Sequence, residues 1–306
     1  MNHRRLAALL VLLLAPTAAP AQHTTTTDHP VVKQLTTEGV EAIGGARIKL
    51  LPPLVTPGMP ADQQRQAFAD LVGERRMDKY LQDSVVASYE LDIQDLGKTA
   101  DRGTIRRLDL YFVVRGNLNI IHQKNLLSGF MNNEETSQAV AESGFETYVK
   151  PVDEAAEKPS ELPPAGVLST GMSKYRFPVL EKVVVSGLVR SAGMHVDGGL
   201  VQSAISPLDL LDDPQNPTVW RPIPRGAEDD TQLGPPAPFG GFFCYLHASQ
   251  LGFEKDAVLV ECHAAYIEPY GWFRGRNLLA SKLPLLMQHN IRDFRRKLKE
   301  AQAEQE

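Results

Sequence analysis

The chain has 306 residues, of which 42% are hydrophobic, and its formal net charge is −5. This acidic balance disfavours a nucleic-acid-binding protein, which needs a basic face, and simple electrostatic docking on anionic membranes. The apolar content is sufficient for a real core, and the length permits one large domain or two small ones.

The first residues have the pattern of an export signal. Arg4 and Arg5 precede an unbroken apolar run over 6–14, and Ala19-Pro20-Ala21 has the A-x-A form of a cleavage site. This order is typical of a secretory signal peptide, and the run is too short to span a bilayer comfortably. We therefore expect a signal peptide over residues 1–21, a periplasmic or extracellular product, and no transmembrane segment after cleavage.

The first half of the mature chain mixes helical and strand patterns. Residues 22–47 begin with a threonine run of low apolar content, which predicts a flexible leader. Alternating apolar residues predict a strand that starts at Val85, and the glycine at position 73 ends the helix before it. The predicted elements are a helix over 61–72, strands over 85–93 and 108–114, and a helix over 133–142.

The second half contains two proline-rich stretches, over 150–173 and 207–238, that read as surface loops. A valine-rich strand over 180–189 and another over 194–205 are predicted between them, joined by a turn at residues 191–193. A short strand is predicted at 219–221, because a long irregular loop inside a compact domain is uncommon. Together these elements predict a single α+β domain over residues 48–306.

Strands over 242–248 and 257–264 are predicted to pair as a hairpin. If the pairing is symmetric about Phe253, Cys244 lies directly opposite Cys262, close to what a disulfide requires. An oxidising compartment would join them, so we predict a disulfide. One face of this hairpin is apolar throughout, and the other carries a polar cluster that consists of Tyr245, His247, Glu261 and His263.

The C-terminal region predicts a long amphipathic helix over 283–303. Its apolar residues recur every three or four positions and draw one stripe along the helix. A strand over 257–267, a Glu268-Pro269-Tyr270-Gly271-Trp272 turn and a Leu-Pro pair precede and open this helix. This arrangement resembles the C-terminal end of START-type lipid-binding domains. The resemblance implies a helix-grip fold, in which a curved antiparallel sheet grips the helix, and a turn at Trp272 that covers the mouth of a cavity.

The helix stripe and the apolar hairpin face are the predicted walls of a ligand site. Arg190 follows a valine-rich run, and a guanidinium buried in a lipid cavity would anchor a head group or carboxylate. No cofactor, metal ion or catalytic residue is assigned. The predicted ligand-binding residues are Leu283, Met287, Ile291, Phe294, Leu246, Val260, Trp272 and Arg190.

We predict an exported soluble binding protein that holds a small apolar ligand or lipid between the sheet and the last helix. Two alternatives stay open. One is an envelope scaffold without a cavity that binds a protein partner. The other is a hydrolase or lyase that uses the polar cluster, although no nucleophile elbow, zinc-protease helix or phosphate loop occurs in the sequence. In the simplest reading, that cluster lies on an exposed outer face and has no chemistry.

Overall fold

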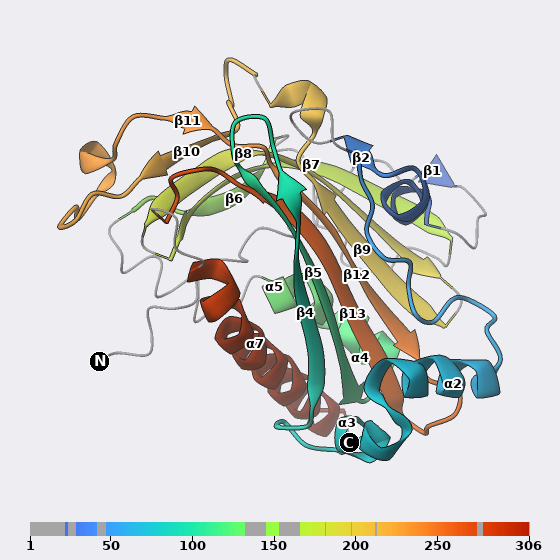
Figure 1. The fold of residues 1–306 in the computed structure, drawn as a ribbon. Helices are drawn as coiled ribbons and strands as arrows, with labels where there is room; N and C mark the ends of the chain where they lie inside the picture. The colour runs from blue at the N-terminus through green and yellow to red at the C-terminus, as the bar shows by residue number, and fades with distance from the viewer. Residues whose placement is uncertain are drawn as a thin grey trace.

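The computed structural model of the chain describes residues 22–23, 29–41, 47–131, 145–152, 166–180, 182–196, 198–211, 213–273 and 278–305. Figure 1 shows a strongly curved sheet with helices on both of its faces. We call the face toward the C-terminal helix the inner face and the opposite one the outer face. The helices of the inner face are α4 (Leu118–Gln123), α5 (Leu126–Met131) and α7 (Leu278–Ala303). Those of the outer face are α1 (Pro30–Lys33), the π-helical turn η2 (Gln34–Glu38), α2 (Ala61–Val72), the 3-10 turn η3 (Glu74–Arg76) and α3 (Met77–Tyr80).

The sheet is antiparallel and, in the described part of the chain, has eleven strands. The main path runs β1-β7-β8-β9-β12-β13-β5-β4, with β6 added to β7, β10 to β8 and β11 to β10. Its strands are β1 (Gln22–His23), β4 (Tyr89–Lys98), β5 (Thr104–Arg115), β6 (Tyr148–Pro151), β7 (Val167–Val179), β8 (Val183–Val196), β9 (Gly199–Ile205), β10 (Val219–Pro222), β11 (Ala237–Pro238), β12 (Phe242–Gln250) and β13 (Ala257–Glu268). A separate pair consists of β2 (Val40–Glu41) and β3 (Arg47–Ile48), and two 3-10 turns are η4 (Leu208–Leu210) and η5 (Asp230–Gln232).

Side-chain alternation along the strands separates three apolar clusters. Even-numbered residues of β5, β12 and β13 point inward and join α4, α5 and α7 in the largest cluster. Odd-numbered residues of the same strands point outward and form two smaller clusters, one under the N-terminal segment and one under α2 and α3. The sheet is therefore buried on both faces along these central strands.

The predicted α+β class and the gripped C-terminal helix are confirmed. The helix predicted over 61–72 coincides with α2, and its end at Gly73 follows from a positive φ of 82° that glycine adopts without strain. The short strand predicted at 219–221 is β10. The helix predicted over 133–142 lies outside the described residues.

Several expectations about the strands and the leader are wrong. The strand predicted to start at Val85 begins only at Tyr89, because residues 84–87 form a turn in which the Ala87 N–H donates to the Ser84 carbonyl. The strand β8 continues through the turn predicted at 191–193, because its cross-strand pairing with β7 and β9 tolerates Gly193 in its interior. The loop predicted over 150–173 already contains the beginning of β7. Residues 29–41 of the predicted flexible leader pack on the outer face, because Val32, Leu35 and Val40 bury their side chains there.

Among the described residues, every helix is too short or too polar to cross a bilayer. The long helix α7 carries several charged residues along its exposed side. It runs diagonally across the concave side of the sheet, beside β4 and β5 in the view of Figure 1.

Candidate functional site

The inner face unites the two predicted walls in one apolar cluster. The helix contributes the whole predicted stripe, and Leu246 of β12 and Val260 of β13 face it from the sheet. The seven predicted apolar ligand-binding residues all belong to this cluster and are each at most 6% exposed. The structure packs them together, whereas their role in binding a ligand stays a prediction.

The two cysteines lie on this inner face but are not opposite each other. The observed pairing places Cys244 across from Ala264, and Cys262 across from Leu246. The predicted register is therefore wrong by two residues, which preserves the face of every side chain but makes the cysteines diagonal neighbours. Diagonal positions are about 7–8 Å apart, too far for an unstrained disulfide. Both cysteines are free and buried, and burial raises the pKa of each thiol.

Arg190 lies outside the apolar interior. It belongs to β8, in which Val185 and Val189 point inward, so the alternation directs Arg190 to the outer face. Its side chain is exposed. The premise that Arg190 is a buried cation in the cavity is therefore wrong.

One end of the inner cluster is rich in aromatic side chains. The Trp272 ring packs against Phe239 at 5.3 Å and Phe273 at 5.8 Å, and it meets Trp220 of β10 edge-on at 6.3 Å between ring centroids. Of these partners, Trp220 belongs to the second proline-rich stretch, Phe239 directly follows it, and Phe273 is the next residue along the turn. That the turn covers a cavity mouth stays a prediction. Sequence patterns did not identify these partners, because aromatic residues in an irregular segment have no periodicity.

Buried polar atoms without hydrogen-bond partners occur around this aromatic end. They belong to side chains that the apolar cluster surrounds, and they have no partner among the described residues. The atoms are Ser173 Oγ, Tyr175 OH, Thr218 Oγ1, Tyr266 OH and Trp272 Nε1. A buried polar group without a partner costs about 1–3 kcal/mol, so their gathering in one region is unusual for a filled core.

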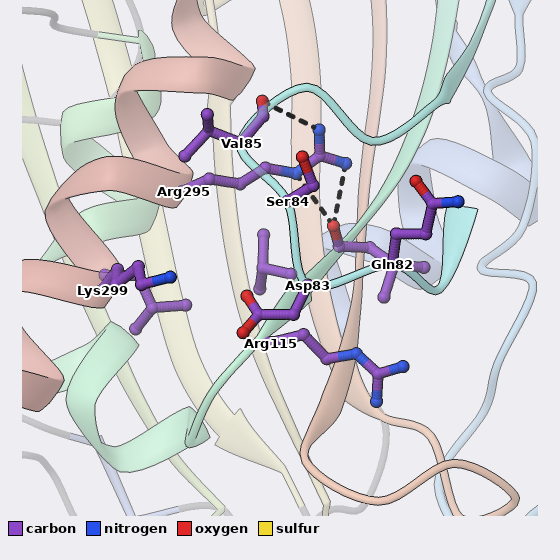
Figure 2. A pocket seen from close by; sticks show the side chains of 10 residues that line it. Gln82, Asp83, Ser84, Val85, Arg115, Arg295 and Lys299 are labelled. Carbon is purple, nitrogen blue, oxygen red and sulfur yellow. Dashed lines mark hydrogen bonds between the residues drawn. The ribbon is translucent and has the colours of Figure 1, made fainter. Parts of the chain in front are cut away.

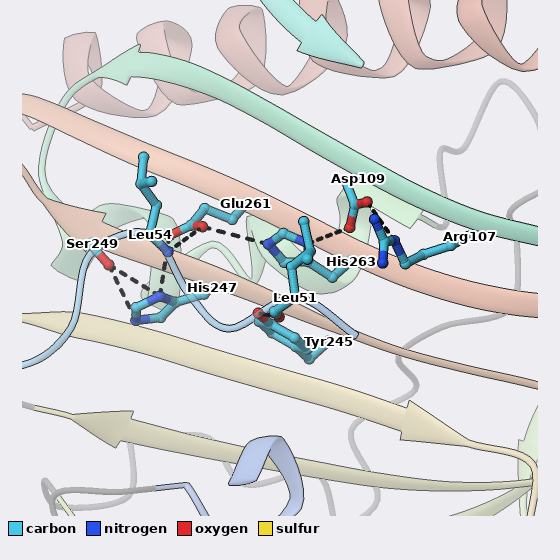
Figure 3. A network of polar contacts seen from close by, with 9 residues as sticks. All are labelled: Leu51, Leu54, Arg107, Asp109, Tyr245, His247, Ser249, Glu261 and His263. Atoms are coloured by element: carbon cyan, nitrogen blue, oxygen red, sulfur yellow. Dashed lines mark hydrogen bonds and ion pairs between the residues drawn. The ribbon is translucent and has the colours of Figure 1, made fainter. Parts of the chain in front are cut away.

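The outer face carries a chain of buried charged side chains (Figure 3). Arg107 Nε donates to Asp109 Oδ2 at 2.8 Å, and Asp109 Oδ1 lies 2.7 Å from His263 Nδ1 on the neighbouring strand. His263 Nε2 in turn lies 3.5 Å from Glu261 Oε2. The prediction of an exposed polar face is therefore wrong: Glu261 and His263 are fully buried.

The chain continues from Glu261 to β12. His247 is the cross-strand partner of Glu261, and its Nδ1 lies 3.5 Å from Glu261 Oε1. The Ser249 hydroxyl lies 3.1 Å from His247 Nε2 and 3.3 Å from Nδ1. A hydroxyl, an imidazole and a carboxylate thus stand in the order that nucleophilic catalysis uses. However, the hydroxyl contacts both ring nitrogens and all three side chains are buried, so this arrangement does not present a nucleophile to a substrate.

The burial and the partners of these groups determine their protonation. Burial alone would raise the pKa of Glu261, but the hydrogen bonds and charges of His247 and His263 lower it to about 2. Burial alone would lower the pKa of His263, but Asp109 and Glu261 outweigh it and raise that pKa above its usual value. The carboxylate of Glu261 therefore stays ionised in the folded protein.

This network fastens the N-terminal segment (residues 29–41 and 47–55) to the sheet. The Leu54 N–H donates to Glu261 Oε2 at 2.8 Å, and the Tyr245 hydroxyl donates to the Leu51 carbonyl at 2.6 Å. His29 is buried at the start of α1, where its Nδ1 accepts the Val32 N–H. Burial, with a smaller contribution from His247, lowers the pKa of His29 to about 4. Among the described residues, no group of three or more His, Cys, Asp or Glu side chains is arranged to hold a metal ion.

The buried cation Arg295 joins α7 to the end of the sheet (Figure 2). Its guanidinium makes five hydrogen bonds to carbonyl oxygens, to Val113 at 2.9 and 3.1 Å, Ala87 at 2.7 Å, Ser88 at 3.3 Å and Val85 at 3.4 Å. Burial lowers the pKa of Arg295 to about 10. The cleft beside it, with about 30 Å³ of space, has room for one or two water molecules. It is too small for a lipid.

Comparisons with known proteins found similar structures only. No family model matches the chain, and no curated protein matches it. The structure resembles human STARD10, with a TM-score of 0.34 and 14% identity over 76% of this chain and 80% of that one. It also resembles the lipid transfer and protein localization domain of human StarD13, with a TM-score of 0.33 and 10% identity over 73% and 95%. Norcoclaurine synthase from Thalictrum flavum matches with a TM-score of 0.28 and 10% identity over 62% and 86%. The first two are START proteins, the family that the C-terminal motif resembles.

Proposed function

We propose that this chain is an exported binding protein that holds a small apolar ligand or lipid between the inner face of the sheet and α7. The observation that carries the proposal is the inner cluster itself. A single apolar interior extends from α7 to the aromatic end at Trp272, and it contains buried polar atoms without partners among the described residues. A core that is filled by the protein alone normally satisfies such atoms.

Affinity in this proposal comes from burial. Each methylene group that leaves water for an apolar interior contributes roughly 0.8 kcal/mol, which is about a fourfold change in dissociation constant at 25 °C. The stripe of α7 provides a wall long enough for an extended chain, because a 26-residue helix rises about 39 Å. The Pro284 ring interrupts the helix hydrogen bonding near its N-terminal end, beside the proposed site.

The test is a competition series on purified mature protein. Straight-chain hydrocarbons of increasing length would compete with a fluorescent apolar probe. We expect affinity to rise about fourfold per methylene until the interior is filled. A flat series, together with no lipid in a solvent extract of the purified protein by mass spectrometry, would overturn the proposal and favour a scaffold without a cavity.

Export is supported by the basic residues, apolar run and cleavage pattern within residues 1–21. The proposed cleavage after Ala21 leaves Gln22 as the first residue. N-terminal sequencing of the exported protein should therefore begin at Gln22. Recovery of the intact chain from the cytosol alone would contradict export without affecting the proposed binding site.

A further inference from the structure

The unpartnered hydroxyls of Tyr175 and Thr218 both lie close to Gly187 of β8. Tyr175 of β7 and Gly187 of β8 are cross-strand partners, and the tyrosine hydroxyl lies beside the glycine. A Cβ atom added to Gly187 would lie 2.7 Å from Thr218 Oγ1 and 2.9 Å from Tyr175 OH. Glycine thus allows both hydroxyls to approach the strand from different elements. Tyr175 is 1% exposed and Thr218 is 3% exposed, so neither hydroxyl reaches solvent.

The other unpartnered atoms border the same place. The Tyr175 ring packs edge-on against Phe242 at 5.8 Å, and Phe242 is the cross-strand partner of Tyr266. The Phe239 N–H donates to the Thr218 carbonyl, and the Phe239 ring contacts Trp272. These five polar atoms therefore lie around the aromatic end of the interior, whereas the other buried side-chain atoms without partners in the described part of the chain belong to His29, Arg176, Glu261 and Asn290.

This polar end contains no free charge among the described residues. Burial raises the pKa of Tyr175, and no charged group contributes. The Ser206 hydroxyl lies close enough to offset this rise in part, but its oxygen already accepts the Phe242 N–H, and no hydrogen bond joins it to Tyr175 OH. Arg106, the charged side chain near Tyr266, is paired with Glu268 at 2.8 Å and Asp95 at 3.9 Å. A charged ligand group placed here would be desolvated without a counter-ion, which is strongly unfavourable. An uncharged oxygen would gain hydrogen bonds instead.

We propose that the interior selects a neutral amphiphile, a long-chain or polycyclic lipid whose polar group is an alcohol or an ester. Its uncharged oxygen hydrogen-bonds to Tyr175 OH and Thr218 Oγ1, and its apolar part lies along the α7 stripe. This inference rests on the proposed binding function and adds the chemistry of the ligand's polar end. The tyrosine donates, and the threonine hydroxyl donates or accepts according to the oxygen that it meets.

The experiment compares three competitors of equal chain length, a primary alcohol, a carboxylic acid at neutral pH and an alkane, against a fluorescent apolar probe bound to the mature protein. We expect the alcohol to bind at least tenfold more tightly than the acid. The double variant Tyr175→Phe/Thr218→Val removes both hydroxyls at nearly constant volume. We expect it to weaken alcohol binding about thirtyfold, from the loss of two hydrogen bonds of about 1 kcal/mol each, and to leave alkane binding within twofold.

Tyr148→Phe is the matched control. Tyr148 lies on β6 beside Val149, the partner of Tyr175, and its side chain points to the opposite face. It should leave all three affinities unchanged. Alkane and alcohol binding that respond equally to the double variant, or an acid that binds more tightly than the alcohol, would overturn the inference while the proposed binding function stands. Failure of all three competitors to displace the probe would overturn both. The unfolding midpoint of each variant reports its folding independently of binding.

Discussion

Truncation of Phe294 tests whether the sheet holds α7. The Phe294 side chain is 3% exposed, and its ring lies edge-on to Phe112 at 5.7 Å and to Phe130 at 6.0 Å between centroids. Replacing a buried phenylalanine by alanine costs about 3–5 kcal/mol, and an edge-to-face aromatic pair contributes about 0.5–1.5 kcal/mol beyond burial. Because two such pairs are lost here, we expect Phe294→Ala to reduce the free energy of unfolding by about 4 kcal/mol.

Urea denaturation followed by circular dichroism measures this loss, with the slope against urea concentration held to the wild-type value. Leu285→Ala is the control, because Leu285 lies on the same helix but is 53% exposed. We expect the control to stay within about 0.5 kcal/mol of wild type. If the two variants lost equal stability, or if Phe294→Ala lost less than about 1 kcal/mol, α7 would not be gripped by the sheet.

Four further predictions concern the buried polar groups. Glu261→Gln removes the carboxylate between two histidines, and we expect a loss of about 3 kcal/mol in urea unfolding at pH 7; an unchanged midpoint would refute the ion-pair network. Arg295→Met leaves buried carbonyl oxygens without donors, at a cost of about 1–3 kcal/mol each. Amide hydrogen exchange over residues 82–88 should therefore accelerate, and wild-type protection there would show that the Arg295 hydrogen bonds do not hold this segment. The folded-state pKa of His29 is about 4, against 6.5 in the unfolded chain, so its stabilisation is present above pH 6.5 and declines as the pH falls toward 4, by about 3 kcal/mol in all. His29→Asn keeps a capping acceptor and should flatten the pH dependence of unfolding between pH 4.5 and 6.5; equal slopes in both proteins would disprove this assignment. Without reductant, a thiol reagent should label Cys244 and Cys262 only after denaturation, whereas a denatured chain that takes up no label would reveal a disulfide.

The sequence predicted elements that depend on neighbouring residues correctly, and it failed where strand pairing depends on residues distant in the chain. The stripe of α7 and the helix over 61–72 were predicted because their period comes from neighbouring side chains on one helix face. The start of β7 was missed, since its residues 167–173 have no marked alternation and pair through distant partners. Register in the β12–β13 hairpin was wrong by two residues, because only the turn geometry and the contacts of β9 and β5 determine it.

Some residues of the candidate sites were likewise predicted from the sequence, and others were found only in the structure. The amino-acid pattern indicated that Leu246, Val260 and the helix stripe share one apolar face, and the structure brings them together. It also grouped His247, Glu261 and His263 on the opposite face. Asp109 and Ser249 of the network, and the Tyr175 and Thr218 hydroxyls, were not identified. A single polar residue inside an apolar strand was the available signal for Asp109.

By itself, the sequence determined which segments are helical or extended and which of their faces are apolar, because these properties depend on residues a few positions apart. Only the tertiary structure decided what covers each face. The N-terminal segment converts an apparently exposed polar face into a buried network, and three segments, namely β7, β8 and the stretch before β10, converge on the hydroxyl pair beside Gly187. Such coverage depends on the summed burial of many remote contacts, and no local pattern of side chains encodes it.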